Sequence, residues 1–324
     1  MKPMTEQTRK TWAIALYACI LLVMRAGIAR SGIAASLAGQ LPPALLSFVL
    51  LLAPLWFFGF GLGEWLARKL SSPWSRAAFP ALLGVPYLVF AIPAGTLRWS
   101  TTVVVFLLPV VLSAVVESSA SKRKMVWQDV VVLGTLFAVY LARLLTPAWP
   151  HAELAVLPKL YVADLALYLY IVLRKLDGVG YSLVPKRDAF LIGLREWAYF
   201  LPLGIGLGAA LRFIHFHAAV PSTASLLSGV LTTFLLVAVP EEMFFRGIFQ
   251  NLLETRFGQN TALVLAALLF GLAHFNRGAS FNWRYVILAT IAGIFYGRAW
   301  RARRQVLASS ITHTAVDVAW WLWF

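Results

Sequence analysis

The sequence has one cysteine, Cys19, among 324 residues, and only 13% of its residues are charged. A single cysteine excludes disulfide frameworks, cysteine-rich metal sites and c-type haem, and argues against a cysteine nucleophile. Acidic residues are scarce, with 13 Asp and Glu against 28 Lys and Arg. The net charge of +15 is spread between apolar runs rather than gathered with aromatic residues on a soluble domain. We therefore expect contact with lipid headgroups and no nucleic-acid partner.

Several common catalytic patterns are also missing. The sequence contains no H-E-x-x-H, no G-x-S-x-G, no G-x-G-D pattern with a second intramembrane Asp, and no phosphate-binding glycine loop. These absences disfavour the corresponding zinc peptidases, serine hydrolases, aspartyl proteases and nucleotide-binding enzymes. No A-x-A-like site follows the first apolar run, which we therefore expect to be a retained span.

Hydrophobic residues make up 60% of the sequence and form long, continuous runs rather than alternating ones. This pattern predicts an all-α polytopic membrane protein. We expect about 11 transmembrane helices, or 10 if one of the proline-containing third and fourth runs does not span. The runs are 12–29, 41–62, 78–97, 101–116, 126–145, 154–173, 190–213, 226–250, 261–276, 285–300 and 306–323.

Charge between these runs predicts their orientation and grouping. With the N-terminus inside, 17 Lys and Arg fall in inner segments and five in outer ones, which favours N-in and C-out. The basic loop at Pro185-Lys186-Arg187 separates six runs from five. We expect an accessory transmembrane region at 1–188, a catalytic transmembrane core at 189–324, and a location in the bacterial cytoplasmic (inner) membrane.

Glu241 and Glu242 are two adjacent acids that end the uncharged run Leu226–Val239. A buried carboxylate in lipid costs at least about 2.5 kcal/mol, so such a pair indicates chemistry, proton movement or ion binding unless it lies at the headgroups. Arg246 is one turn from Glu242, so the two are expected to form an ion pair. Glu241 points about 100° away from that pair.

Two more polar patterns follow: His274 lies four residues after Phe270, and Asp317 lies four residues after His313. At ~1.5 Å per residue, Glu241 is on the order of 14 Å from the inner end of its run, and His274 is roughly 20 Å from its own. His313 is about 12 Å from the inner end of the last run, with Asp317 roughly 6 Å deeper. Because the apolar core is ~30 Å thick, all four can meet near mid-membrane.

Such a group of side chains can activate water. A carboxylate in an apolar pocket is a usable general base, and a neighbouring His can share the bound water. A second His with a carboxylate one turn away can polarise a substrate carbonyl. The same four residues, Glu241, His274, His313 and Asp317, could instead bind a divalent metal such as zinc. Either His alone could equally be a packing residue, and Phe270 alone is better explained by packing.

The three patterns together resemble the CAAX prenyl endopeptidase and bacteriocin-processing family, called CPBP or ABI. The matching segments are Glu241–Gly247, Phe270–His274 and His313–Asp317, which occur in the family's order. The resemblance covers roughly residues 190–324. It implies a glutamate-dependent intramembrane endopeptidase that requires no cofactor.

By this resemblance, Glu241 and His274 activate water, and His313 with Asp317 forms the oxyanion side, with Glu242, Arg246 and Phe270 in support. Many family members carry Asn where this chain has Asp317, so a metal-binding or His-orienting role is open for that residue. The expected partner is a peptide or protein substrate at the membrane. The alternatives are a non-catalytic immunity or partner-binding protein and a cation-coupled transporter.

Overall fold

The computed structural model describes residues 6–30, 32–119, 124–276 and 281–324. Its ordered elements are helices, and no strand occurs in these residues. The all-helical fold expected from the long apolar runs is therefore confirmed for the described part of the chain.

Six helical segments within the described ranges are long and apolar enough to cross a membrane: Glu6–Ile28, Leu41–Phe58, Trp99–Glu117, Ala152–Leu173, Arg187–Ala210 and Thr223–Phe257. Each of the eleven predicted runs contains a helix. The count of eleven spans and the N-in orientation remain predictions. Some of the counted charges lie in 1–5, 120–123 and 277–280, outside the described residues.

The third predicted run, 78–97, is broken by its prolines. It forms a 3₁₀ helix, η2 (Phe79–Gly84), and the short helix α6 (Val85–Ala91), with a proline in the first turn of each. Proline lacks a backbone N–H and disrupts a helix interior, whereas the first turn tolerates it. Pro80 and Pro86 therefore start two short helices where the apolar pattern alone predicted one.

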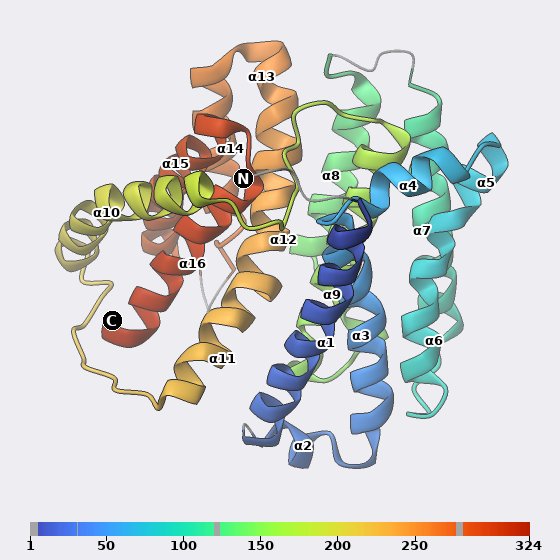
Figure 1. The fold of residues 1–324 in the computed structure, drawn as a ribbon, viewed down its shortest axis with the longest axis horizontal. Helices are drawn as coiled ribbons and strands as arrows, with labels where there is room; N and C mark the ends of the chain where they lie inside the picture. The colour runs from blue at the N-terminus through green and yellow to red at the C-terminus, as the bar shows by residue number, and fades with distance from the viewer. Residues whose placement is uncertain (1–5, 31, 120–123, 277–280) are drawn as a thin grey trace. The chain divides into compact units, whose positions relative to one another are not determined.

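The chain divides into two compact units. The first contains residues 1–122 and 126–176, and α3 packs there against both α6 and α9; Figure 1 shows α1, α3 and α9 lying side by side. A buried ion pair joins Arg174 Nε to Asp129 Oδ1 at 3.1 Å within this unit. Besides η2 and α6, the helices of this unit are α1 (Glu6–Arg30), α2 (Ile33–Ser36), η1 (Ala38–Gln40), α3 (Leu41–Phe58), α4 (Leu62–Lys69), α5 (Pro73–Ala78), α7 (Trp99–Glu117), α8 (Trp127–Leu141), η3 (Thr146–Ala148), η4 (Ala152–Leu154), α9 (Val156–Leu167) and η5 (Tyr168–Leu173).

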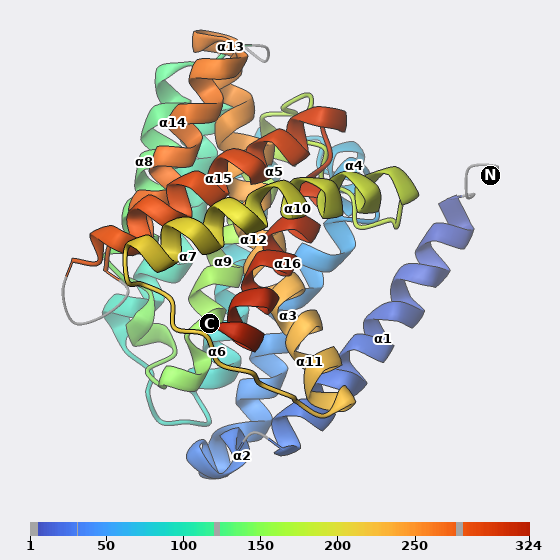
Figure 2. The ribbon, with the colours of Figure 1, turned by 90° about the vertical axis from the view of Figure 1, so that its left-hand side faces the viewer.

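The second unit contains residues 123–125 and 177–324. In it α15 packs against α10, α14 and α16, and Figure 2 shows α10 and α15 side by side. Its helices are α10 (Arg187–Ala210), α11 (Thr223–Thr233), η6 (Phe234–Ala238), α12 (Val239–Glu242), η7 (Met243–Gln250), α13 (Asn251–Phe257), α14 (Gln259–Leu272), α15 (Trp283–Arg303) and α16 (Val306–Trp323).

One continuous helical segment, Thr223–Phe257, carries the two adjacent acids. Within it, η6 and η7 are π-helical stretches that flank the short α-helical turn containing Glu241 and Glu242. Pro240 lies just after η6, and a proline removes one hydrogen bond and crowds the carbonyl four residues before it. A wider turn relieves that crowding, and such π-turns are frequent at functional sites.

Gly271 allows α14 and α15 to approach closely. A Cβ atom at this position would lie 1.9 Å from Thr290 Oγ1 and 2.6 Å from the backbone oxygen of Val286. Any larger residue would push the two helices apart. The glycine therefore holds Phe270 of α14, and His274 in the turn that follows it, against the side chains of α15.

Candidate active site

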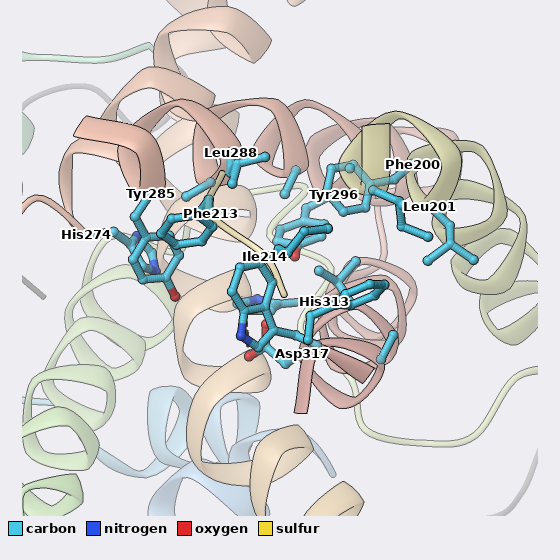
Figure 3. A pocket seen from close by; sticks show the side chains of 18 of the residues that line it. Phe200, Leu201, Phe213, Ile214, His274, Tyr285, Leu288, Tyr296, His313 and Asp317 are labelled. Atoms are coloured by element: carbon cyan, nitrogen blue, oxygen red, sulfur yellow. Dashed lines mark ion pairs between the residues drawn. The ribbon is translucent and has the colours of Figure 1, made fainter. Parts of the chain in front are cut away.

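The second unit contains a cavity of about 300 Å³. Its walls come from α10, the loop after α10, η6, α12, α14, the turn after α14, α15 and α16, and most of its lining is apolar or aromatic. Figure 3 shows His313 and Asp317 in this cavity, and His274 beside Tyr285 at one side of it. The four predicted residues, Glu241, His274, His313 and Asp317, all line it, together with Phe270.

Glu242 lies behind the cavity and joins two other predicted residues. Its Oε2 accepts a hydrogen bond from Arg246 Nε at 3.1 Å, and its Oε1 lies 2.9 Å from His313 Nδ1. Glu242 and Arg246 are fully buried, and His313 is 3% exposed. Because an ionised carboxylate only accepts hydrogen bonds, Nδ1 of His313 carries the hydrogen. The expected ion pair is therefore present and also orients an imidazole from α16.

The other ring nitrogen of His313 faces the remaining acids. Nε2 lies 3.5 Å from Asp317 Oδ2 and 4.0 Å from Glu241 Oε2. The longer separation exceeds a direct hydrogen bond and leaves Glu241 at charge-contact distance. The Asp317 side chain is 38% exposed, whereas that of Glu241 is 9% exposed. One imidazole thus lies among three carboxylates of different exposure.

His274 lies in the turn after α14 and is held by the last turn of that helix. Its Nδ1 lies 2.8 Å from the backbone oxygen of Phe270, one turn earlier. A carbonyl oxygen accepts only, so Nδ1 is the donor, and Nε2 of the neutral ring carries the lone pair. This is the tautomer that can accept a proton or a hydrogen bond from water at Nε2.

Aromatic side chains separate and orient the two histidines. The Phe270 ring lies 4.8 Å from His274 and 5.6 Å from His313 between centroids. Tyr296 stacks on His313 at 4.6 Å, and Tyr285 packs on His274 at 4.9 Å. These tyrosines were not among the residues predicted from the sequence. The available signal was their spacing of eleven residues, about three helical turns, which places both on one face of α15.

The buried guanidinium of Arg246 is surrounded by rings. Its central carbon lies 4.9 Å from the Phe270 centroid and 5.9 Å from that of Tyr296. Neither Nη atom has a hydrogen-bond partner among the described residues. Cation–π attraction and the Glu242 carboxylate together offset part of the cost of burying this charge.

The metal-binding alternative stays a prediction. Within the ranges that the structure describes, no three His, Cys, Asp or Glu side chains are grouped so that they could hold a metal ion. Nδ1 of His313 is engaged with Glu242, and Nδ1 of His274 with a backbone oxygen. Both contacts engage Nδ1 and leave Nε2 of each ring directed elsewhere.

Residues 223–319 match a family model described as type II CAAX prenyl endopeptidase Rce1-like. Comparisons with curated proteins and with solved structures found no match. The matched segment includes Glu241–Gly247, Phe270–His274 and His313–Asp317, so the resemblance expected from these motifs is confirmed. The long apolar helices and this match together indicate an integral membrane protein. Over residues 223–319, the chain is similar to a family of membrane endopeptidases.

Proposed function

We propose that the chain is an intramembrane endopeptidase, with residues 189–324 as its catalytic core and residues 1–188 as an accessory transmembrane region. The observation that carries this proposal is the cavity: Glu241, His274, His313 and Asp317 line one space whose other walls are mainly apolar. Polar groups collected in an apolar cavity are expensive to maintain without a chemical role.

In the proposed reaction, Glu241 and Nε2 of His274 hold a water molecule. Glu241 takes a proton as the water oxygen attacks the carbonyl carbon of the scissile peptide bond. The carbon–nitrogen bond then breaks, and the leaving nitrogen takes the proton from Glu241. A general base of this kind contributes on the order of 10²–10⁴-fold to the rate.

His313 stabilises the developing oxyanion in this proposal. Its Nδ1–H is held by Glu242 at 2.9 Å, so its Nε2 is directed toward Glu241 and Asp317. When protonated, Nε2–H donates to the carbonyl oxygen as negative charge develops there. Asp317 holds the imidazole through the contact of its side-chain oxygen with Nε2, so its role is to orient His313 rather than to donate to the oxyanion itself.

The proposed substrate is a peptide or protein that is anchored in or delivered to the membrane. The proposed location is the bacterial cytoplasmic membrane. Phe200, Phe213, Tyr285 and Trp320 line the cavity around the polar group. Such a lining fits a peptide segment with large apolar side chains or a lipid modification. A prenyl group is therefore one option among several.

Cleavage assays on the full chain in lipid vesicles test the proposal. The probes are farnesylated and unmodified CaaX-type peptides and a transmembrane peptide, with products identified by mass spectrometry. Glu241→Ala and His274→Ala should abolish cleavage, while Asp188→Asn, an acid at the start of α10 outside the cavity, should leave it intact. Cleavage at the wild-type rate by both Glu241→Ala and His274→Ala would overturn the mechanism.

A further inference from the structure

The second unit contains another pocket, of about 390 Å³, that is strongly basic. We call it the arginine pocket. It is lined by Arg195 and Glu196 of α10, Gln259 of α14, and Arg298, Arg301, Ala302 and Arg304 at the end of α15. None of these residues lines the catalytic cavity.

The arginines are positioned by specific partners. Glu196, only 1% exposed, lies 2.8 Å from Arg195 Nη2 and 3.0 Å from Arg298 Nε. Arg301 Nη1 donates to the side-chain oxygen of Asn260 at 3.1 Å. Arg304 pairs with Glu254. Three of the four guanidinium groups thus pair with two carboxylates and the fourth with an amide, which leaves an excess of two positive charges at the pocket.

The guanidinium groups remain accessible from the pocket. The side chains of Arg195, Arg298 and Arg304 are 49%, 42% and 38% exposed. A guanidinium that is tethered at one edge keeps other N–H groups for a second acceptor, and phosphate oxygens match that planar fork. Gln259 is the first residue of α14, whose first turn has no side-chain cap and therefore leaves backbone N–H groups available.

Helix stabilisation alone does not account for this arrangement. Arginines in the last turn of α15 interact favourably with the helix dipole. However, Arg195 comes from the first half of α10, and the buried Glu196 holds it beside Arg298. A pair of helices that merely placed cations at the headgroups would not need a buried acid to draw two of them together.

We propose that the arginine pocket binds a phosphate group carrying net negative charge. The ligand chemistry is a phosphate ester of an anionic lipid headgroup or free phosphate. Binding would also bear on the catalytic cavity, because Arg298 lies 5.3 Å from the Phe295 ring and Phe295 packs at 5.6 Å on Phe200, which lines that cavity. The proposal stands independently of the peptidase activity.

The test uses the purified full chain in detergent. Native mass spectrometry with phosphatidylglycerol and phosphatidylcholine measures lipid retention, and calorimetry with inorganic phosphate measures free-anion binding. Arg298→Gln/Arg301→Gln should weaken binding of the preferred probe about tenfold, as expected for two lost charge-assisted contacts. Arg298→Lys/Arg301→Lys should retain more affinity than the Gln pair because it keeps both charges.

Two further variants control for a general loss of charge and for poor folding. Arg256→Gln/Arg284→Gln removes the same number of charges outside the pocket and should bind like wild type. Arg195→Gln removes a half-exposed group without altering α15, and should weaken binding even if the α15 variants fold poorly. If only the pocket variants lose affinity for phosphatidylglycerol, the pocket is a lipid site. If they lose affinity for inorganic phosphate alone, it is a free-anion site. Equal binding by wild type and all pocket variants, or binding by none of them, would overturn the proposal.

Discussion

Glu242 and His313, 71 residues apart in the chain, meet at 2.9 Å between Oε1 and Nδ1 in the interior of the second unit. The same carboxylate is 3.1 Å from Arg246. The two adjacent acids, Glu241 and Glu242, therefore have different surroundings. Glu242 connects a buried cation to an imidazole, whereas Glu241 lines the cavity.

Removing the Glu242 charge should destabilise the protein. In Glu242→Gln, the buried Arg246 loses its counter-charge, and breaking one side of a buried pair typically costs about 3–5 kcal/mol. Thermal unfolding in detergent measures this loss. The double variant Glu242→Leu/Arg246→Met, which removes both charges, should recover much of the stability but no activity. Equal unfolding temperatures for wild type and Glu242→Gln would contradict the central role of this pair.

Asp317→Asn should preserve most of the proposed peptidase activity, within about tenfold. The amide keeps the size of the side chain and a polar contact with Nε2 of His313, which lies 3.5 Å from Oδ2 of Asp317 in the wild type. Asp317→Ala should lose more, because it leaves the ring without a partner on that side. Initial cleavage rates of the two variants measure the difference. An Asn variant as impaired as Ala would show that the negative charge is required.

Tyr296→Ala should reduce the proposed cleavage rate by about 10-fold or more, with a smaller change for Tyr296→Phe. The ring stacks on His313 at 4.6 Å and an interplanar angle of 15°, so its loss frees the imidazole to tilt. A small misplacement of a catalytic group can lower rates by up to about 10². Rates at saturating substrate report this effect. A Phe variant as slow as Ala would assign the effect to the hydroxyl group instead.

Gly271→Ala should destabilise the fold by about 1–3 kcal/mol, as expected for overpacking. The added Cβ meets Thr290 Oγ1 and the Val286 backbone between α14 and α15. Gly206→Ala on α10 is the matched control, since no atom lies within 4 Å of its Cβ position. That control should be neutral or slightly stabilising because Ala is the better helix former. Unfolding midpoints compare the pair, and an unchanged Gly271→Ala midpoint would refute the tight helix contact.

Chelator treatment should leave the proposed peptidase activity unchanged. No group of metal ligands forms among the described His, Cys, Asp and Glu residues. Activity is measured after incubation with EDTA or phenanthroline, followed by addition of Zn²⁺. Loss with chelator and recovery with zinc would instead assign the four cavity residues to a metal site, and the glutamate mechanism would be wrong.

Helix periodicity and helix rise made part of this site predictable. Contacts one turn apart, such as Glu242 with Arg246, depend only on the local helix, and the depth estimate placed Glu241, His274, His313 and Asp317 at compatible levels. The structure places all four on one cavity, although their catalytic roles remain a proposal.

Contacts between distant helices could not be read from the sequence in the same way. The bond between Glu242 and His313 depends on how α12 and α16 are rotated toward each other, which no local pattern specifies. The prolines of the 78–97 run favoured an interruption, whereas its apolar content alone predicted a span. The polar residues of α15 and α16 also lower the hydropathy of these two helices, and neither is among the six segments that are long and apolar enough to cross a membrane.

The π-helical stretches on either side of Glu241 and Glu242 hold extra chain length within one continuous helical segment. A π-turn closes with a bond between residues i and i+5, one residue later than an α-turn. Deleting a single residue from η6 should therefore let that stretch close to an ordinary α-turn and leave the two acids at about the same angle relative to α11. The same deletion in a purely α-helical stretch would instead correspond to about 100° of rotation. The π-turn before the acids is thus a place where the chain can lose a residue while Glu242 still faces His313 and Glu241 still faces the cavity.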